Sequence, residues 1–158
     1  MKKICVIGIG NPLRGDDGVG IVLLNKLMQK KNLLPKEIDF IDGGIGGMNL
    51  LHVIVQYDIV FIIDAVQLNS KPGSFRIFTA DEIELYKKTN CFSTHIDQLS
   101  QVIQISKQLG ELPKQFFIFG VQPKDISFRL DLTKEVKEKI NMIMDHLILN
   151  IKNIVLKN

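Results

Sequence analysis

The sequence contains few of the features that define a secreted or membrane protein. It has only two cysteines in 158 residues, which excludes a framework of disulfides. No uninterrupted apolar run approaches the roughly 20 residues needed to cross a bilayer. The short apolar run after Lys2 and Lys3 ends at Gly8, and no signal-peptide cleavage site follows it. We therefore expect a cytoplasmic protein that does not act at a membrane.

A strong excess of charge is also missing. The formal net charge is +3, and the lysines are scattered, with only short clusters such as the one at 134–139. This distribution is typical of a solvated surface, so we expect no nucleic-acid partner. Hydrophobic residues make up 46% and charged residues 23% of the chain, which predicts one globular domain spanning 1–158.

Strand-like and helix-like segments alternate along the chain, which indicates an α/β fold. We predict a three-layer structure, with a twisted, mostly parallel sheet of about five strands and helices on both faces. Segment 59–63 is apolar throughout, as in a central parallel strand, whereas Pro72 and Gly73 place the next strand at an edge. The apolar stripe after Thr133 is interpreted as core. The expected strands are 3–8, 37–41, 59–63, 74–79 and 116–120, and the expected helices are 18–30, 48–56, 94–108 and one beginning near 133.

The most informative segment is 8–20, which begins like a phosphate-binding turn and then departs from that pattern. Gly10 and Gly15 have the glycine spacing of a P-loop, but Asp16 stands where that motif requires lysine. Leu13 stands where the dinucleotide fingerprint requires its third glycine. Two successive carboxylates, on Asp16 and Asp17, would repel a phosphate, so the segment favours a cation site. A cofactor site with an acid after the second strand, in the segment 42–44, is the weaker alternative.

Acidic residues follow three of the expected strands. Ligands of open α/β sheets bind beyond the carboxyl ends of the strands, where Asp16 and Asp17, Asp42 and Asp64 would lie, with His95 nearby. Gathered carboxylates are relieved by a cation or a shared proton, and oxygen with imidazole suits zinc, nickel, manganese or iron. Asp17, Asp64 and His95 would form a three-ligand site with open coordination positions. The catalytic candidates are Asp17, Asp42, Asp64 and His95.

Each candidate also has a structural interpretation. Asp16 or Asp17 could cap the helix that follows, and Asp42 could form a turn with the two glycines after it. His95 could be a loop histidine, or it could pair with Cys91 as a thiol–imidazole couple. The convergence of these residues on one sheet edge favours function over the structural interpretations. The other two histidines fall in helical patterns and are assigned to structure: His52 and His146.

Five motifs in order span nearly the whole chain and together resemble one known family. They are Gly8-Ile9-Gly10-Asn11 with Asp16-Asp17-Gly18-Val19-Gly20, Asp42-Gly43-Gly44 with Gly47-Met48, Asp64-Ala65, Thr94-His95 with Gln98-Leu99, and Gly120-Val121-Gln122-Pro123. The set resembles the hydrogenase maturation endopeptidases, which process the large subunit of nickel–iron hydrogenases. The resemblance implies a twisted, mostly parallel sheet flanked by helices, with metal-binding positions at Asp17, Asp64 and His95.

The resemblance also implies an activity. The family removes the C-terminal tail of the hydrogenase large-subunit precursor after nickel has been inserted, so nickel held by the substrate's cysteines is the expected metal. Zinc or cadmium are other divalent ions that the site could take. Either the cation or a carboxylate base, Asp42 or Asp16, would activate water.

Two other functions remain open at this point. One is a nickel-binding chaperone without proteolysis. The other is a peptidyl-tRNA hydrolase, because such chains open with a similar Gly-x-Gly-Asn-Pro turn. By similarity to the family we expect a monomer, although segment 133–155 could form a dimer face.

Overall fold

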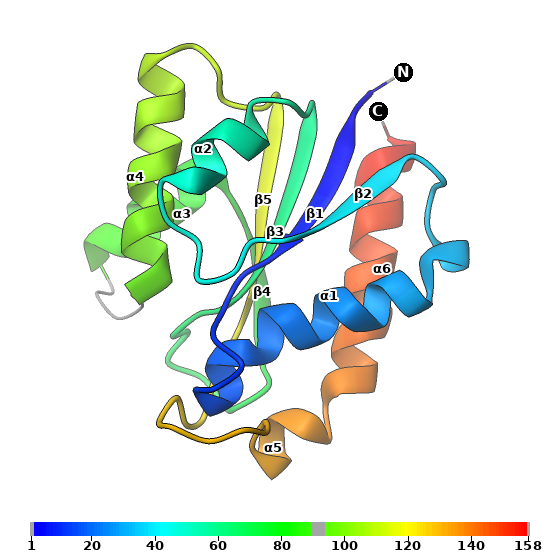
Figure 1. Cartoon of the computed structure of the whole chain (residues 1–158), viewed down its shortest axis with the longest axis vertical. Helices are drawn as coiled ribbons and strands as arrows, with labels where there is room; N and C mark the ends of the chain where they lie inside the picture. The colour runs from blue at the N-terminus through cyan, green and yellow to red at the C-terminus, as the bar shows by residue number, and fades with distance from the viewer. Residues whose placement is uncertain (1, 90–93, 158) are drawn as a thin grey trace.

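A five-stranded mixed sheet forms the centre of the protein, in the order β2-β1-β3-β5-β4 (Figure 1). The structure is a computed structural model and describes residues 2–89 and 94–157. Four strands are parallel, and β4 pairs antiparallel with β5 at the sheet edge, as the residues before it predict. The strands are β1 (Ile4–Gly8), β2 (Ile38–Asp42), β3 (Ile59–Ala65), β4 (Phe75–Thr79) and β5 (Gln115–Val121).

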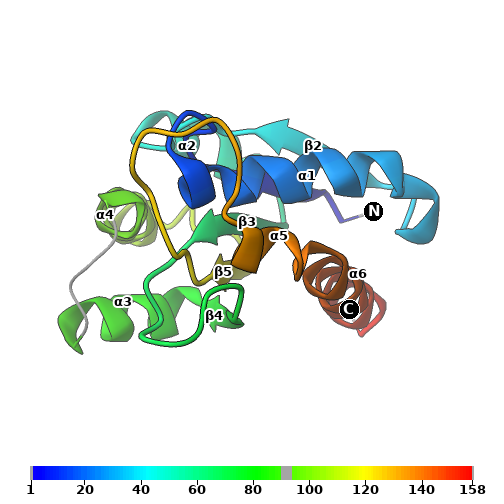
Figure 2. The same ribbon diagram turned by 90° about the horizontal axis from the view of Figure 1, so that it is seen from below.

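Helices cover both faces of the sheet, which confirms the predicted three-layer fold (Figure 2). The first face is covered by α1 (Val19–Gln29), α5 (Lys134–Lys137) and α6 (Ile140–Leu156). The second is covered by α2 (Asn49–Ile54), α3 (Ala80–Thr89) and α4 (Thr94–Gln108). Short 3-10 turns, η1 (Gly15–Gly18) and η2 (Lys31–Leu33), precede and follow α1. Among the described residues, no helix combines the length and apolar character needed to span a membrane.

The central strand β3 shows why its sequence is apolar throughout. All seven of its residues are buried, because alternate side chains enter the two cores on opposite faces of the sheet. In β1, Cys5 enters the second core and is fully buried. Burial, with a smaller effect of Asp39, raises the pKa of the Cys5 thiol to about 12. The prediction that Cys5 is a small buried hydrophobic residue is therefore confirmed.

Two elements differ from the sequence prediction. Helix α3 was not predicted, although it begins with a capping box: Glu82 N–H donates to Thr79 Oγ1 at 3.3 Å, and Thr79 N–H donates to Glu82 Oε2 at 2.8 Å. The predicted continuous final helix is divided into α5 and α6. At this break Lys139 lies against the loop before β4, and its ammonium donates to the Pro72 carbonyl at 2.8 Å. The apolar stripe of α6 is buried against the sheet, which confirms that it is core.

Candidate functional site

Three of the predicted site residues come together beyond the carboxyl ends of the parallel strands. Asp17 lies in η1 directly after the loop that follows β1, Asp64 lies near the end of β3, and His95 lies in the first turn of α4. All three are nearly inaccessible, with exposed fractions of 4%, 0% and 7%. Sequence-distant segments therefore deliver two carboxylates and one imidazole to a single buried position.

Glycine at position 20 makes this close approach possible. A Cβ atom there would lie 2.3 Å from the carbonyl oxygens of both Ile9 and Ile63, which is far inside contact distance. The first turn of α1 can therefore lie directly against the end of β3 only without a side chain at Gly20. This packing brings Asp17, three residues earlier in the chain, to the side of Asp64.

The imidazole of His95 lies between the two carboxylates. Its Nδ1 is 3.0 Å from Asp64 Oδ1, a hydrogen-bond distance, and its Nε2 is 3.7 Å from Asp17 Oδ2. Asp17 Oδ2 also accepts a hydrogen bond from the Asn11 N–H at 3.0 Å. Asp64 Oδ2 is buried and has no hydrogen-bond partner in the described part of the chain. An unpaired buried carboxylate oxygen is costly, so a proton or a cation at this oxygen would stabilise the site.

Burial and proximity shift the proton affinities of the pair. Burial raises the pKa of Asp64 from 3.8 to about 6, although the His95 interaction opposes this effect. The hydrogen bond with Asp64 raises the pKa of His95 above its usual value, against the effect of burial. The shared hydrogen bond therefore couples the proton affinities of the two groups, because a proton on one changes the charge that the other faces.

The arrangement bears on how a metal ion could be held. The two ring nitrogens of His95 face different carboxylates, so Asp17 and Asp64 lie on opposite sides of the imidazole. Within residues 2–89 and 94–157, no three His, Cys, Asp or Glu side chains form a group that could hold a metal ion. The 3.7 Å between His95 Nε2 and Asp17 Oδ2 is close to the ~3.4 Å between two tetrahedral ligands that are each ~2.1 Å from one ion. These two atoms could share an ion while Asp64 orients the ring, and the three-ligand set stays a prediction.

Asp16, unlike its neighbour Asp17, anchors a loop. Its carboxylate is fully buried and accepts four hydrogen bonds, from Lys124 N–H, Asp125 N–H, Thr133 N–H and the Thr133 hydroxyl, at 2.7 to 3.2 Å. Both oxygens are therefore occupied in fixing the loop between β5 and α5. This bonding leaves neither oxygen free to act as a base, which disfavours Asp16 in that role.

Asp42 lies at the end of β2 and takes part in a turn, which was the structural interpretation of this residue. The side chain is exposed, and its Oδ1 accepts the Gly44 N–H at 2.8 Å. Gly43 N–H donates to Gly8 O, and Gly10 N–H donates to Gly44 O, both at 2.8 Å, so the turn is fixed against the segment after β1. Among the described contacts none joins Asp42 to the Asp17–His95–Asp64 group. Its catalytic role remains a prediction.

Gln122 is a structural residue at this edge whose role the sequence did not reveal. It is only 4% exposed, and its Oε1 accepts the N–H groups of Leu68 and Ser70 at 2.6 and 3.4 Å. Its Nε2 donates to Gln67 Oε1 at 2.9 Å and to the Pro123 carbonyl at 2.8 Å. The last of the five motifs thus joins the loop after β3 to the loop after β5. Its signal in the sequence was a polar residue directly after an apolar strand.

The remaining candidates do not enlarge the site. His52 is exposed on α2, and His146 on α6 packs against the Phe75 ring with centroids 5.0 Å apart, so both lie in helices as predicted. Cys91 and Ser93 lie outside the described residues, so the proposed Cys91–His95 pair stays a prediction.

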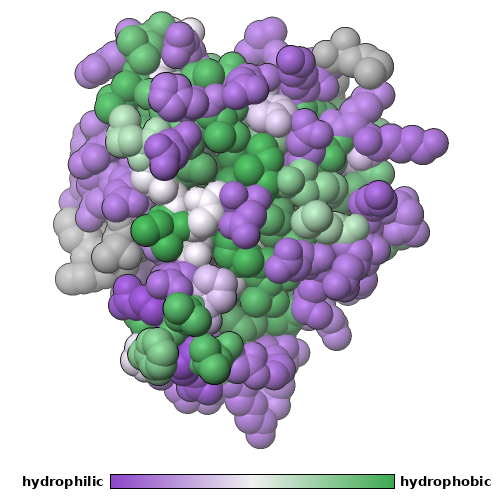
Figure 3. All heavy atoms as spheres, in the orientation of Figure 1, coloured by the Kyte–Doolittle hydropathy of each residue, from purple (hydrophilic) through white to green (hydrophobic). Residues whose placement is uncertain are grey.

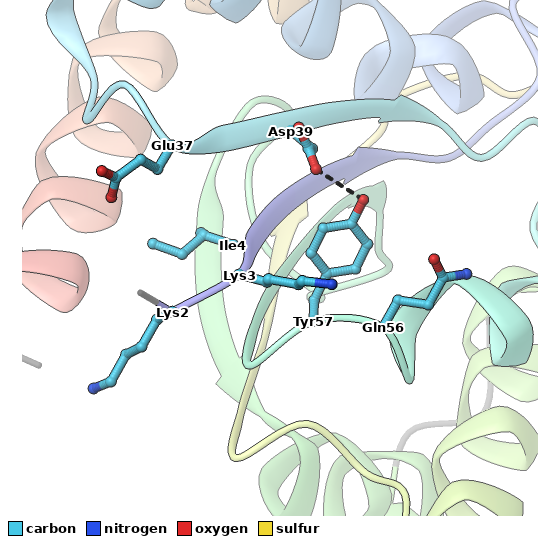
Figure 4. A pocket seen from close by; sticks show the side chains of 7 residues that line it. All are labelled: Lys2, Lys3, Ile4, Glu37, Asp39, Gln56 and Tyr57. Carbon is cyan, nitrogen blue, oxygen red and sulfur yellow. Dashed lines mark hydrogen bonds between the residues drawn. The ribbon is translucent and has the colours of Figure 1, made fainter.

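A pocket of about 450 Å³ lies at the opposite end of the strands from the candidate site, beside the start of β1 and β2 (Figure 4). Tyr57 donates a hydrogen bond to Asp39 there at 3.0 Å. Figure 4 shows Lys2 and Glu37 extending away from this pair, so the charged groups do not converge. The pocket lies at the amino ends of the strands, where open α/β sheets do not bind their ligands.

Comparison with known proteins identifies the family. Residues 22–150, more than half of the chain, match the family model described as hydrogenase maturation protease. The chain belongs to the hydrogenase maturation protease family. The family recognised from the five motifs is thus confirmed, and the matched range includes Asp64 and His95 but begins after Asp17.

Individual family members support the same conclusion. The hydrogenase 2 maturation protease of Escherichia coli strain K12 is 31% identical over 147 residues, which cover 92% of this chain and 88% of that protein. The hydrogenase expression/formation protein HupD of Thiocapsa roseopersicina is 30% identical over 139 residues, which cover 87% of this chain and 62% of that longer protein. The solved hydrogenase maturating endopeptidase HybD from E. coli has a TM-score of 0.80 at 30% identity and covers 92% of this chain and 89% of its own. This maturation-protease chain therefore has the three-layer fold of its solved relatives.

Proposed function

We propose that this chain is an endopeptidase that removes the C-terminal tail of a nickel-loaded hydrogenase large-subunit precursor. Membership of the maturation protease family supports the peptidase class and the substrate protein. The observation that carries the proposal is the buried Asp17–His95–Asp64 group, with one unpaired carboxylate oxygen, at the ligand-binding edge of the sheet. In a chain of this family, such a group suits contact with a cation brought by the substrate.

Two of the three site residues would contact the metal ion, and the third would orient the imidazole ring. Asp17 Oδ2 and His95 Nε2 face each other and would approach the nickel that the precursor's cysteines hold. Asp64 accepts or shares the proton on His95 Nδ1 and so fixes the ring with Nε2 toward Asp17. Asp64 joins the metal contact through its unpaired Oδ2 if the ring turns to let the ion reach it. Nickel in this proposal belongs to the substrate, and zinc or cadmium are ions of similar charge that the same groups could bind.

Two routes to hydrolysis are compatible with this arrangement. The cation could polarise the scissile carbonyl or lower the pKa of a water molecule. Alternatively, Asp42 could act as general base while nickel serves only for recognition. Asp42→Asn separates the routes, because the second predicts loss of cleavage with substrate binding intact. Full activity in this variant would remove Asp42 from the mechanism.

The proposal is tested by the mass of the precursor after incubation with the chain. We expect a shortened product from nickel-loaded precursor and none from nickel-free precursor. His95→Gln should abolish cleavage, whereas His146→Gln, on the exposed side of α6, is the matched control and should leave it unchanged. A precursor of unchanged length that gains or loses nickel would indicate a chaperone instead. Stoichiometric nickel that stays on the isolated chain through chelator treatment would contradict supply by the substrate.

A further inference from the structure

Large apolar side chains are exposed together beside the candidate site. They come from the loop after β1 and the loop after β5, and we call them the apolar platform: Leu13, Ile126, Phe128 and Leu130, with exposed fractions of 51%, 40%, 80% and 77%. Figure 3 shows a small group of apolar side chains at the lower left of the molecule, in the region of these loops and bordered by hydrophilic side chains. Apolar side chains that gather at one place on a surface mark interaction sites more often than scattered ones do.

Backbone pairing places these side chains on one face. Arg14 and Arg129 form an isolated parallel bridge, in which Gly15 N–H donates to Arg129 O at 2.9 Å and Arg129 N–H donates to Leu13 O at 3.0 Å. These two hydrogen bonds hold the backbone of Leu13 and Arg14 directly beside that of Arg129. The exposed side chain of Leu13 therefore belongs to the same part of the surface as those of Phe128 and Leu130, which flank Arg129.

The platform is a fixed surface. The Asp16 carboxylate holds the loop at both ends, at Lys124 and Asp125 and again at Thr133. Within the loop, Ser127 N–H donates to Asp125 Oδ1 at 2.8 Å. An apolar surface held in one conformation loses little conformational entropy when a partner covers it.

The platform is continuous with the site. Leu13 precedes Asp17 by four residues, so the two lie within about 15 Å along the chain. Asp17 N–H donates to the Arg14 carbonyl at 3.1 Å, and Arg14 Nε donates to the Ile126 carbonyl at 3.1 Å. Arg14 thus stands between the site and the platform, and no carboxylate of the described residues lies within ion-pair distance of its guanidinium.

We propose that the apolar platform, with Arg14, is a docking surface for an extended segment of the hydrogenase large-subunit precursor that carries apolar side chains and an acidic group. This inference rests on the proposed function of the neighbouring site. Apolar side chains of the segment would cover Phe128, Leu130 and Leu13, and its carboxylate would pair with Arg14. A second copy of this chain fits less well, because a two-fold contact centred on the platform would supply apolar groups and a second Arg14 guanidinium but no additional carboxylate to pair with it.

The test compares two leucines of equal exposure. Leu130→Ser and Phe128→Ser alter the platform, whereas Leu156→Ser alters a leucine that is 79% exposed at the end of α6, on the opposite side of the molecule (Figure 1). None of these side chains is packed in the core, so all three variants should fold. Arg14→Gln, with Lys36→Gln as a remote control for loss of charge, tests the ionic contact. Binding of purified nickel-loaded precursor and kcat/KM for tail removal are measured for each.

We expect Phe128→Ser and Leu130→Ser each to weaken precursor binding by about tenfold, with kcat/KM falling mainly through KM. Arg14→Gln should weaken binding and reduce its dependence on salt. The two control variants should match the unmodified chain. Equal precursor binding by the platform variants and by Leu156→Ser would overturn the inference, as would platform variants that change only self-association in sedimentation.

Failure of the inference can be told apart from failure of the proposed function. If the unmodified chain removes the tail and the platform variants do so equally well, only the docking proposal falls. If the unmodified chain removes no tail, the proposed function is wrong. The binding measurement alone then shows whether the platform docks the precursor. In that case weaker binding by Phe128→Ser supports docking, and absence of any binding overturns it.

Discussion

The four hydrogen bonds to Asp16 make a conservative substitution there unusually informative. Asp16→Asn keeps the size of the side chain but replaces one acceptor oxygen with an NH2 donor. In one orientation this NH2 group faces the Thr133 N–H; in the other it faces the three donors around Oδ2. Either way at least one buried donor loses its acceptor, and the remaining bonds lose the assistance of the negative charge.

The size of the effect follows from these contacts. A hydrogen bond to an ionised group contributes about 1.5–3 kcal/mol, and an unsatisfied buried donor adds a cost of similar size. Partial relaxation of the loop offsets some of this, so we expect Asp16→Asn to lower the free energy of unfolding by about 2–4 kcal/mol. Urea unfolding measures this quantity. Hydrogen exchange should accelerate most at the amides of Lys124, Asp125 and Thr133, which donate to the carboxylate.

A matched substitution controls for the loss of one negative charge. Asp97 is 64% exposed and pairs with Lys87 at 3.2 Å on the surface, so Asp97→Asn should change the free energy of unfolding by less than about 0.5 kcal/mol. A loss below about 1 kcal/mol for Asp16→Asn, with unchanged exchange at the three amides, would refute the anchoring role of Asp16.

Two further predictions concern stability. The folded pKa of Asp64, about 6, and the folded pKa of His95 are both raised, so their stabilising contribution is present at low pH and lost as pH rises through those values. The free energy of unfolding of Asp64→Asn should therefore gain about 2 kcal/mol relative to the unmodified chain between pH 4 and pH 7, and urea unfolding that shows parallel pH profiles would contradict this. Gly20→Ala should cost at least about 3 kcal/mol, because its Cβ would overlap two carbonyl oxygens at 2.3 Å. Gly110→Ala, whose Cβ meets nothing within 4 Å, should cost only about 1–2 kcal/mol in thermal or urea unfolding, for its φ of +71°.

The fold was predictable where hydrophobic pattern alone decides the structure. The apolar segment around β3 and the Pro72-Gly73 pair before β4 placed a central strand and an edge strand correctly. Helix α3 was missed because its sequence carries only a weak apolar stripe, and the capping box at Thr79 and Glu82 was the available signal. At the break between α5 and α6, Lys139 contacts a loop 67 residues earlier, and no local pattern in the sequence encodes such a contact.

The site was predictable as a location and less so as an arrangement. Strand ends and the first turn of α4 were enough to bring Asp17, Asp64 and His95 together, because parallel strands share one carboxyl edge. The different roles of the adjacent residues Asp16 and Asp17 were not predictable from the sequence. They depend on which of the two carboxylates the loop between β5 and α5 contacts. The position of the imidazole between two carboxylates likewise follows from the packing of α4 against the sheet.

Contact between His95 and nickel in the precursor is tested most directly by the nickel X-ray absorption spectrum of rapidly frozen mixtures. Nickel-loaded precursor is measured alone, with the unmodified chain and with His95→Gln. We predict that the unmodified chain adds an imidazole nitrogen to the nickel coordination shell and that His95→Gln does not. An unchanged nickel spectrum in a mixture that still loses its C-terminal tail would contradict the account.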